Sequence, residues 1–103
     1  MASSKDYLEF ILDQLSGLAG VTYRPMMSEY IIYYNGKIIG GIYDNRFLVK
    51  CMDSAKKLMP QASLTAPYPG AKDMILVDNV DDREFLESLL TEMGKELSAS
   101  KRK

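Results

Sequence analysis

The stretch Tyr30–Lys50, YIIYYNGKIIGGIYDNRFLVK, decides the fold of this chain of 103 residues. It holds three runs rich in β-branched and aromatic residues, separated by Asn35-Gly36 and by Asp44-Asn45. Asn-Gly suits the two positive φ angles of a type I′ turn, and Asp-Asn can form a second two-residue turn. The stretch therefore predicts an antiparallel meander of three strands.

The two turns also set the pairing of the strands, on the assumption that neither hairpin carries a bulge. The expected pairs are Tyr34 with Lys37, Ile32 with Ile39, Tyr43 with Arg46, and Ile42 with Phe47. Because side chains alternate along a strand, this register separates two faces of the sheet. The predicted core face holds Ile31, Tyr33, Ile38, Gly40, Ile42, Phe47 and Val49. The predicted mixed face holds Tyr30, Ile32, Tyr34, Lys37, Ile39, Gly41, Tyr43, Arg46, Leu48 and Lys50.

Helical periodicity flanks the meander on both sides. Apolar residues at helical spacing predict a helix from Ser3 or Ser4 to about Leu18, with Gly17 and Gly20 ending it. A second apolar stripe near the C-terminus predicts a helix capped by Asp81 or Asp82. Both helices would bury one stripe each against a sheet.

The remaining segments complete the order of elements. We expect a short strand over residues 21–24, with Pro25 at a sheet edge, and a short helix over 53–59 that Pro60 stops. Residues 61–72 read as an ordered loop and 74–77 as a strand. The predicted fold is α+β, a two-layer domain with an antiparallel meander packed on helices in the order α-β-β-β-β-α-β-α.

Length and composition favour a single domain over residues 1–103. Hydrophobic residues make up 47% of the chain and charged residues 26%, close to the averages for globular domains. The basic residues near the C-terminus suggest that 99–103 form a disordered tail. A polar N-terminus without an apolar central stretch argues against a secretory signal, and no run is long enough for a membrane helix. We therefore expect a cytoplasmic protein without membrane contact.

The residue types present exclude several kinds of chemistry. The chain has no histidine and one cysteine, Cys51, which excludes Ser/His/Asp hydrolases, Cys/His proteases and zinc sites that use histidine. The acidic cluster of residues 78–84 fits helix capping and solubility better than any calcium-loop spacing. We expect no catalytic site, no cofactor and no metal, and hence a protein that is not an enzyme.

The mixed face is the candidate functional site. The contact residues that we expect are Tyr30, Ile32, Tyr34, Lys37, Ile39, Tyr43, Arg46, Leu48 and Lys50. These aromatic and aliphatic groups favour burial against a protein partner or a second copy in a homodimer. Stacking of the tyrosines on bases, with the cations on phosphates, is the alternative. It is less favoured because aliphatic side chains outnumber cations and the net charge is −1. A partly solvated sheet of cross-strand pairs is the third interpretation.

Several segments together resemble the N-terminal domain of the TfoX/Sxy family. They are Tyr7-Leu8 with Leu15, Thr22-Tyr23-Arg24, Met26-Met27, Glu29-Tyr30, Tyr-Asn-Gly-Lys at 34–37 and Tyr-Pro-Gly-Ala-Lys at 68–72. The resemblance runs from about Ser4 to Leu97, but Pro25 replaces an expected basic residue and Ser28 an expected glycine. It implies a fold related to secretion chaperones and a part in regulating competence and transcription, with no catalytic residues. The full-length regulators carry a further C-terminal helical domain, and we expect this chain to be a stand-alone N-terminal domain that lacks it.

Overall fold

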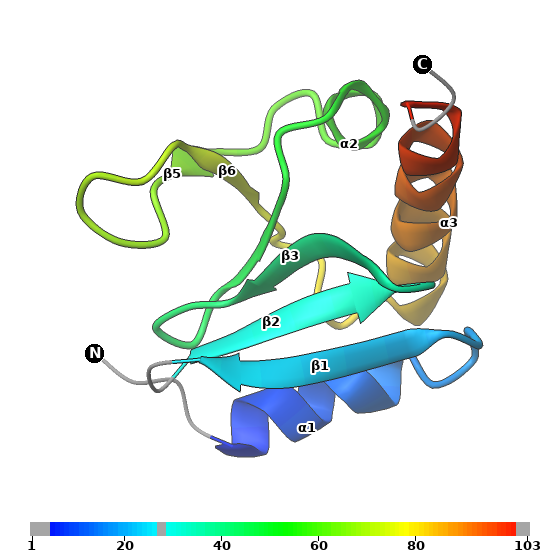
Figure 1. Ribbon diagram of the computed structural model, residues 1–103, viewed down its shortest axis with the longest axis horizontal. Helices are drawn as coiled ribbons and strands as arrows, with labels where there is room; N and C mark the ends of the chain where they lie inside the picture. Colours follow the sequence, from blue (N-terminus) through cyan, green and yellow to red (C-terminus); the bar gives the residue numbers. More distant parts are fainter. Residues whose placement is uncertain (1–4, 27–28, 101–103) are drawn as a thin grey trace.

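The computed structural model describes residues 5–26 and 29–100, with side chains through residue 97 (Figure 1). It is an α+β fold with a six-stranded, wholly antiparallel sheet in the order β1-β2-β3-β4-β6-β5. The elements are α1 (Lys5–Gln14), β1 (Val21–Met26), β2 (Glu29–Tyr34), β3 (Lys37–Ile42), β4 (Phe47–Val49), α2 (Asp53–Leu58), β5 (Leu64–Thr65), β6 (Met74–Leu76) and α3 (Arg83–Ser100). The predicted fold class is confirmed.

All three helices bury their apolar residues on the same side of the sheet. The shared core contains Leu8, Ile11 and Leu15 from the α1 region, Ala55 from α2, Leu86, Leu89, Leu90 and Met93 from α3, and Ile32, Ile39, Ile42, Phe47, Val49, Ile75 and Val77 from the sheet region. In Figure 1, α1 is drawn below β1 in the view, and α2 lies beside the C-terminal half of α3. This side is the helix layer of a two-layer domain.

Both predicted two-residue turns are confirmed. Asn35 and Gly36 have φ angles of 53° and 81°, and Asp44 and Asn45 have φ angles of 55° and 57°. Two consecutive positive φ angles are the signature of a type I′ hairpin. The meander of β2, β3 and β4 therefore forms from local turn chemistry.

The predicted register of the first hairpin is wrong beyond its turn, because β3 carries a bulge. Tyr34 lies opposite Lys37 and Tyr33 opposite Ile38, but Ile32 lies opposite Gly40 and not Ile39. Ile39 is the extra residue, and its side chain is fully buried in the helix-side core. Gly40 then lies so close to β4 that a Cβ atom would come within 2.7 Å of Val49 Cα. In the second hairpin Ile42 does lie opposite Phe47.

Several boundaries differ from the predictions. Helix α1 ends at Gln14, and the chain continues in turns in which Leu18 N–H donates to Leu15 O. Gly20 has a positive φ of 90°, as expected of a residue that turns the chain. The predicted loop contains the two-residue strand β5, and α3 continues to Ser100, so residues 99 and 100 are helical. The start at Ser3 or Ser4, Met27-Ser28 and the basic residues 101–103 lie outside the described residues.

Candidate functional site

The predicted mixed face does not exist as one surface, because the bulge turns part of it into the core. Ile32 and Ile39 are fully buried on the helix side. Tyr34 lies against α3, since a Cβ on Gly94 would come within 2.8 Å of its Cε2. Tyr30 is half-buried against the same core, and its ring centroid lies 5.9 Å from that of Tyr23. Lys37 is half-buried beside the Asn-Gly turn.

The other predicted contact residues do belong to the side that the helices leave uncovered. Leu48 lies between the core residues Phe47 and Val49 of β4, so its side chain is on the side of the sheet away from the helices. It is nevertheless fully buried, and it is not part of the helix-side core. The ring of Tyr43 covers its neighbour Gly41, where a Cβ would come within 2.8 Å of Tyr43 Cε2. Lys50 follows β4 and is exposed. Leu48 is therefore covered by parts of the chain other than the helices.

Arg46 also extends across this side of the sheet. Its Nε donates to Tyr43 O at 3.2 Å, and its Nη1 donates to Thr65 Oγ1 at 3.2 Å. Because β6 lies between β4 and β5, the arginine side chain crosses the uncovered side of the sheet to reach Thr65. Burial, together with the nearby Tyr68 and Glu29, raises the pKa of the Tyr43 phenol above its ordinary value. The β4-β6-β5 half of this side is thus partly closed by the protein's own side chains.

The β1-β2-β3 half stays open, and we call its side chains the open patch: Arg24, Met26, Ile31, Tyr33 and Ile38. The register places Arg24 opposite Ile31 and Tyr33 opposite Ile38, so these side chains share one side of the sheet. Ile38 keeps 39% of its surface exposed and Met26 keeps 40%, while Ile31 and Tyr33 are half-buried. None of the five belongs to the helix-side core or is packed against it.

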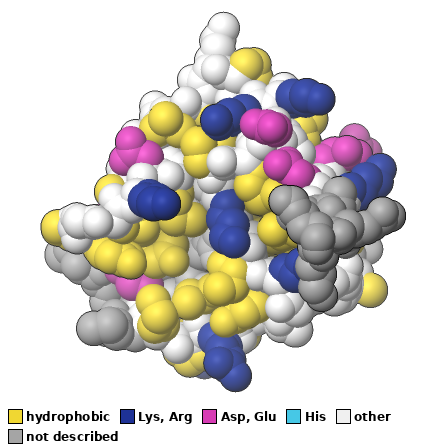
Figure 2. All heavy atoms as spheres, turned by 45° about the horizontal axis from the view of Figure 1, so that its top comes forward, with side chains coloured by type: hydrophobic (Ala, Val, Ile, Leu, Met, Phe, Trp, Pro, Cys, Tyr) yellow, Lys and Arg dark blue, Asp and Glu magenta, His cyan; other side chains and the backbone are white. Residues whose placement is uncertain are grey.

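The open patch combines apolar side chains with an unneutralised cation. Within the described residues, the guanidinium of Arg24 has no hydrogen-bond or ion-pair partner. The nearest carboxylate by register, that of Glu29, accepts the Asp44 N–H at 3.2 Å. The face in Figure 2 likewise carries contiguous hydrophobic side chains between lysine and arginine side chains. Arginine and tyrosine amid aliphatic side chains are typical of the energetic centre of a protein interface.

Sequence reasoning missed the open patch because it assumed regular alternation through β3. Gly40 and Gly41 both lie where neighbouring atoms leave no room for a Cβ. Adjacent glycines inside a strand also indicate a bulge. Compared with the register predicted without a bulge, a bulge near these glycines exchanges the faces of Ile38 and Ile39. It also exchanges the two faces of β2. The adjacent glycines therefore indicated that this strand contains a bulge, but the sequence did not show at which residue the bulge lies.

Side chains that could ligate a metal ion are scattered over the described part of the chain. In residues 5–26 and 29–100, no three His, Cys, Asp or Glu side chains are grouped so that they could hold a metal ion. Cys51 is exposed and unpaired. Among the described helices, none is both long and apolar enough to cross a membrane.

The fold and the open patch define the class: an α+β domain whose sheet is covered by helices on one side and half open on the other. The chain is 32% identical over 102 residues to the "Uncharacterized 12.7 kDa protein in trpE 5′region" of Spirochaeta aurantia, covering 98% of this chain and 89% of that protein. The chain belongs to the same family as that protein. No family model matches the chain, and no solved structure matches it.

Proposed function

We propose that this chain is a non-enzymatic protein-interaction domain that binds its partner through the open patch. The observation that carries the proposal is the position of Ile38, Met26 and Arg24 on the side of the sheet that no described helix covers. Ile38 and Met26 would each gain apolar burial in a complex, at about 25 cal/mol per Å² removed from water.

Arg24 adds a preference for partners that present a carboxylate. A guanidinium without an internal partner can form a paired hydrogen bond to a carboxylate at little reorganisation cost. The surrounding aliphatic groups exclude water and strengthen that contact. The partner surface that suits the open patch is therefore apolar with an acidic group near its centre.

The resemblance to the TfoX/Sxy N-terminal domain supports a regulatory setting for this binding. As part of the same proposal, the domain acts in the cytoplasm, in a pathway related to competence or transcription. A second copy of the chain is one possible protein partner, which would make the active form a homodimer.

A pair of matched variants tests the proposal. Ile38 on the open patch and Phe10 on α1 are 39% and 40% exposed, so glutamate replaces an equally exposed apolar residue in each. We expect Ile38→Glu and Arg24→Glu to lose partners captured from the native cytosol, or to lose self-association in sedimentation, while Phe10→Glu retains them. Equal recovery by all three variants contradicts the proposal.

Binding of nucleic acid is the second candidate, because Arg24 and Tyr33 lie together on the open patch. Mobility of labelled single- and double-stranded DNA at low salt distinguishes the two. Retardation that weakens with added salt and disappears in Arg24→Glu favours nucleic acid. Unchanged mobility removes this candidate and leaves the protein partner.

A further inference from the structure

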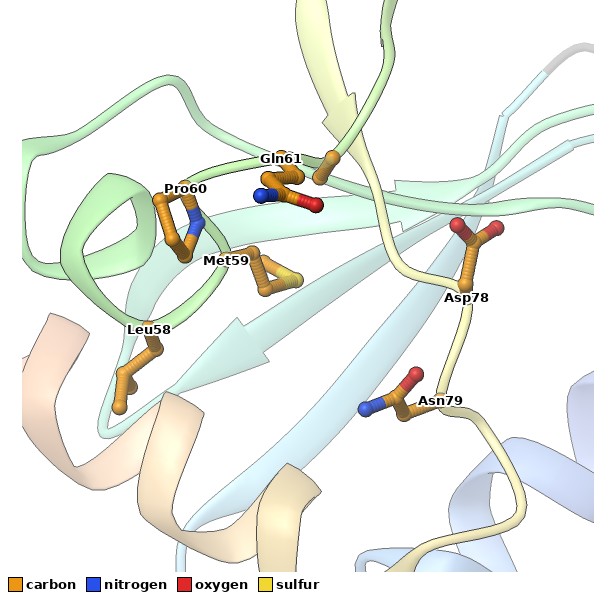
Figure 3. A pocket seen from close by; sticks show the side chains of 7 residues that line it. Leu58, Met59, Pro60, Gln61, Asp78 and Asn79 are labelled. Carbon is orange, nitrogen blue, oxygen red and sulfur yellow. The ribbon is translucent and has the colours of Figure 1, made fainter.

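A hollow of about 430 Å³ lies at the C-terminal end of α2, between two segments that are distant in the sequence (Figure 3). One segment follows α2 and the other follows β6. The lining residues are Leu58, Met59, Pro60, Gln61, Ala62, Asp78 and Asn79. Small-molecule sites typically measure about 300–1,000 Å³, so the hollow has room for a small ligand.

Backbone hydrogen bonds hold both walls in place. On one side, Met59 N–H donates to Ala55 O at 2.9 Å, and Ala62 N–H donates to Met59 O at 3.1 Å. On the other side, Asp82 N–H donates to Asn79 O at 3.0 Å. The buried Gln14 fixes the same segment, because its Nε2 donates to Val80 O at 2.9 Å. The hollow is therefore formed before any ligand arrives, which lowers the entropic cost of binding.

The two walls differ in chemistry. Leu58, Met59 and Pro60 form an apolar wall, while Asp78 and Asn79 project from the facing segment (Figure 3). Among the described residues that line the hollow, Asp78 is the one with a charged side chain. In the described part of the chain, no side-chain hydrogen bond engages Asp78, Asn79 or Gln61. One carboxylate and two carboxamides are thus available to a ligand above an apolar wall.

We infer that this hollow binds a small organic cation, a primary ammonium carried on an apolar chain or ring. The ammonium would donate to the Asp78 carboxylate and to the carboxamide oxygens of Asn79 and Gln61, while the apolar part packs on Leu58 and Met59. A charge-assisted hydrogen bond of this kind is about twice as strong as a neutral one. A bound metal ion fits less well because a lone carboxylate supplies too few hard ligands. An anion would meet the Asp78 charge, which no cation among the lining residues offsets.

Nuclear magnetic resonance titration of the full ¹⁵N-labelled chain tests the inference with three ring compounds of similar size. Phenethylamine is the cationic probe, 2-phenylethanol is the neutral match and phenylacetate is the anionic match. We expect phenethylamine to shift the amides of residues 58–62 and 78–79 with a Kd of about 1 mM. The alcohol should bind about threefold more weakly, and phenylacetate should not bind there.

Two substitutions in one loop provide the matched control. Because Asp78 is exposed, Asp78→Asn should weaken phenethylamine binding about threefold, whereas Asp81→Asn, outside the lining residues, should leave it unchanged. Asn79→Asp adds a second carboxylate to the lining and should strengthen binding. Equal affinity for the amine and the alcohol, shifts confined to other residues, or unchanged binding by Asp78→Asn would each overturn the inference.

Discussion

Substitution of the adjacent residues Ile38 and Ile39 by alanine, one at a time, tests the bulge that places the open patch. Ile39 is fully buried and Ile38 is 39% exposed. Regular alternation without a bulge predicts the reverse, with Ile38 in the core. The two variants remove the same atoms from neighbouring positions, so their difference reports burial alone.

The size of the effect follows from the atoms removed. Isoleucine to alanine deletes three carbons, and burial of each contributes about 0.8 kcal/mol. With the cavity left behind, Ile39→Ala should lower the free energy of unfolding by about 3–4 kcal/mol. Ile38→Ala should lower it by no more than about 1 kcal/mol, because its surroundings include water. For a domain of this size each kcal/mol corresponds to about 4–8 °C in Tm.

Urea unfolding followed by circular dichroism measures both variants against the unmodified protein. If the slope of the free energy of unfolding against urea concentration is the same for each variant, the comparison concerns the same transition. If Ile38→Ala costs more than Ile39→Ala, the register described for β3 is incorrect, and the residues of the open patch are misassigned.

Three further variants test other contacts, each by urea unfolding. Gly40→Ala should destabilise by about 3 kcal/mol or more, because the new Cβ would lie within 2.7 Å of Val49 Cα in the neighbouring backbone. Asp82→Ala should cost about 1 kcal/mol, since Asp82 Oδ1 accepts a first-turn N–H of α3 at 3.1 Å; no loss would show that this cap contributes nothing. The N–H of Ser54 donates to Glu96 Oε1 at 2.8 Å, and this hydrogen bond lowers the pKa of the Glu96 carboxyl. The stabilisation that the ionised carboxyl contributes is therefore present above its ordinary pKa. It is lost as pH falls through the lower pKa of the folded state. Glu96→Gln should therefore be less stable than the unmodified protein at pH 6, and this difference should shrink as the pH falls well below 4.5; a constant difference contradicts the assignment.

Much of the fold could be predicted because its signals are local. Asn35-Gly36 specifies its turn through two positive φ angles, and the apolar stripe of α3 shows its buried side at helical spacing. The Asp82 cap also follows from side-chain chemistry within one turn. Such features depend on a few neighbouring residues, which the sequence presents directly.

The candidate site could not be predicted with the same success, because one extra residue in β3 changes the faces of Ile38, Ile39 and every residue of β2. Whether Ile38 or Ile39 enters the core depends on how β3 packs on β4 at Gly40, a contact between separate strands. The partial closure of the β4-β6-β5 half depends similarly on the reach of Arg46 to Thr65. Long-range packing of this kind leaves little trace in a single sequence.

The most direct test of the open patch is solvent exposure of the isoleucine methyl groups. A soluble paramagnetic agent broadens methyl resonances in proportion to their access to water, and the chain can be labelled at isoleucine δ1 positions. The structure predicts strong broadening for Ile38, with Ile32, Ile39 and Ile42 protected. Protection of Ile38 together with broadening of Ile39 would contradict the proposed binding surface.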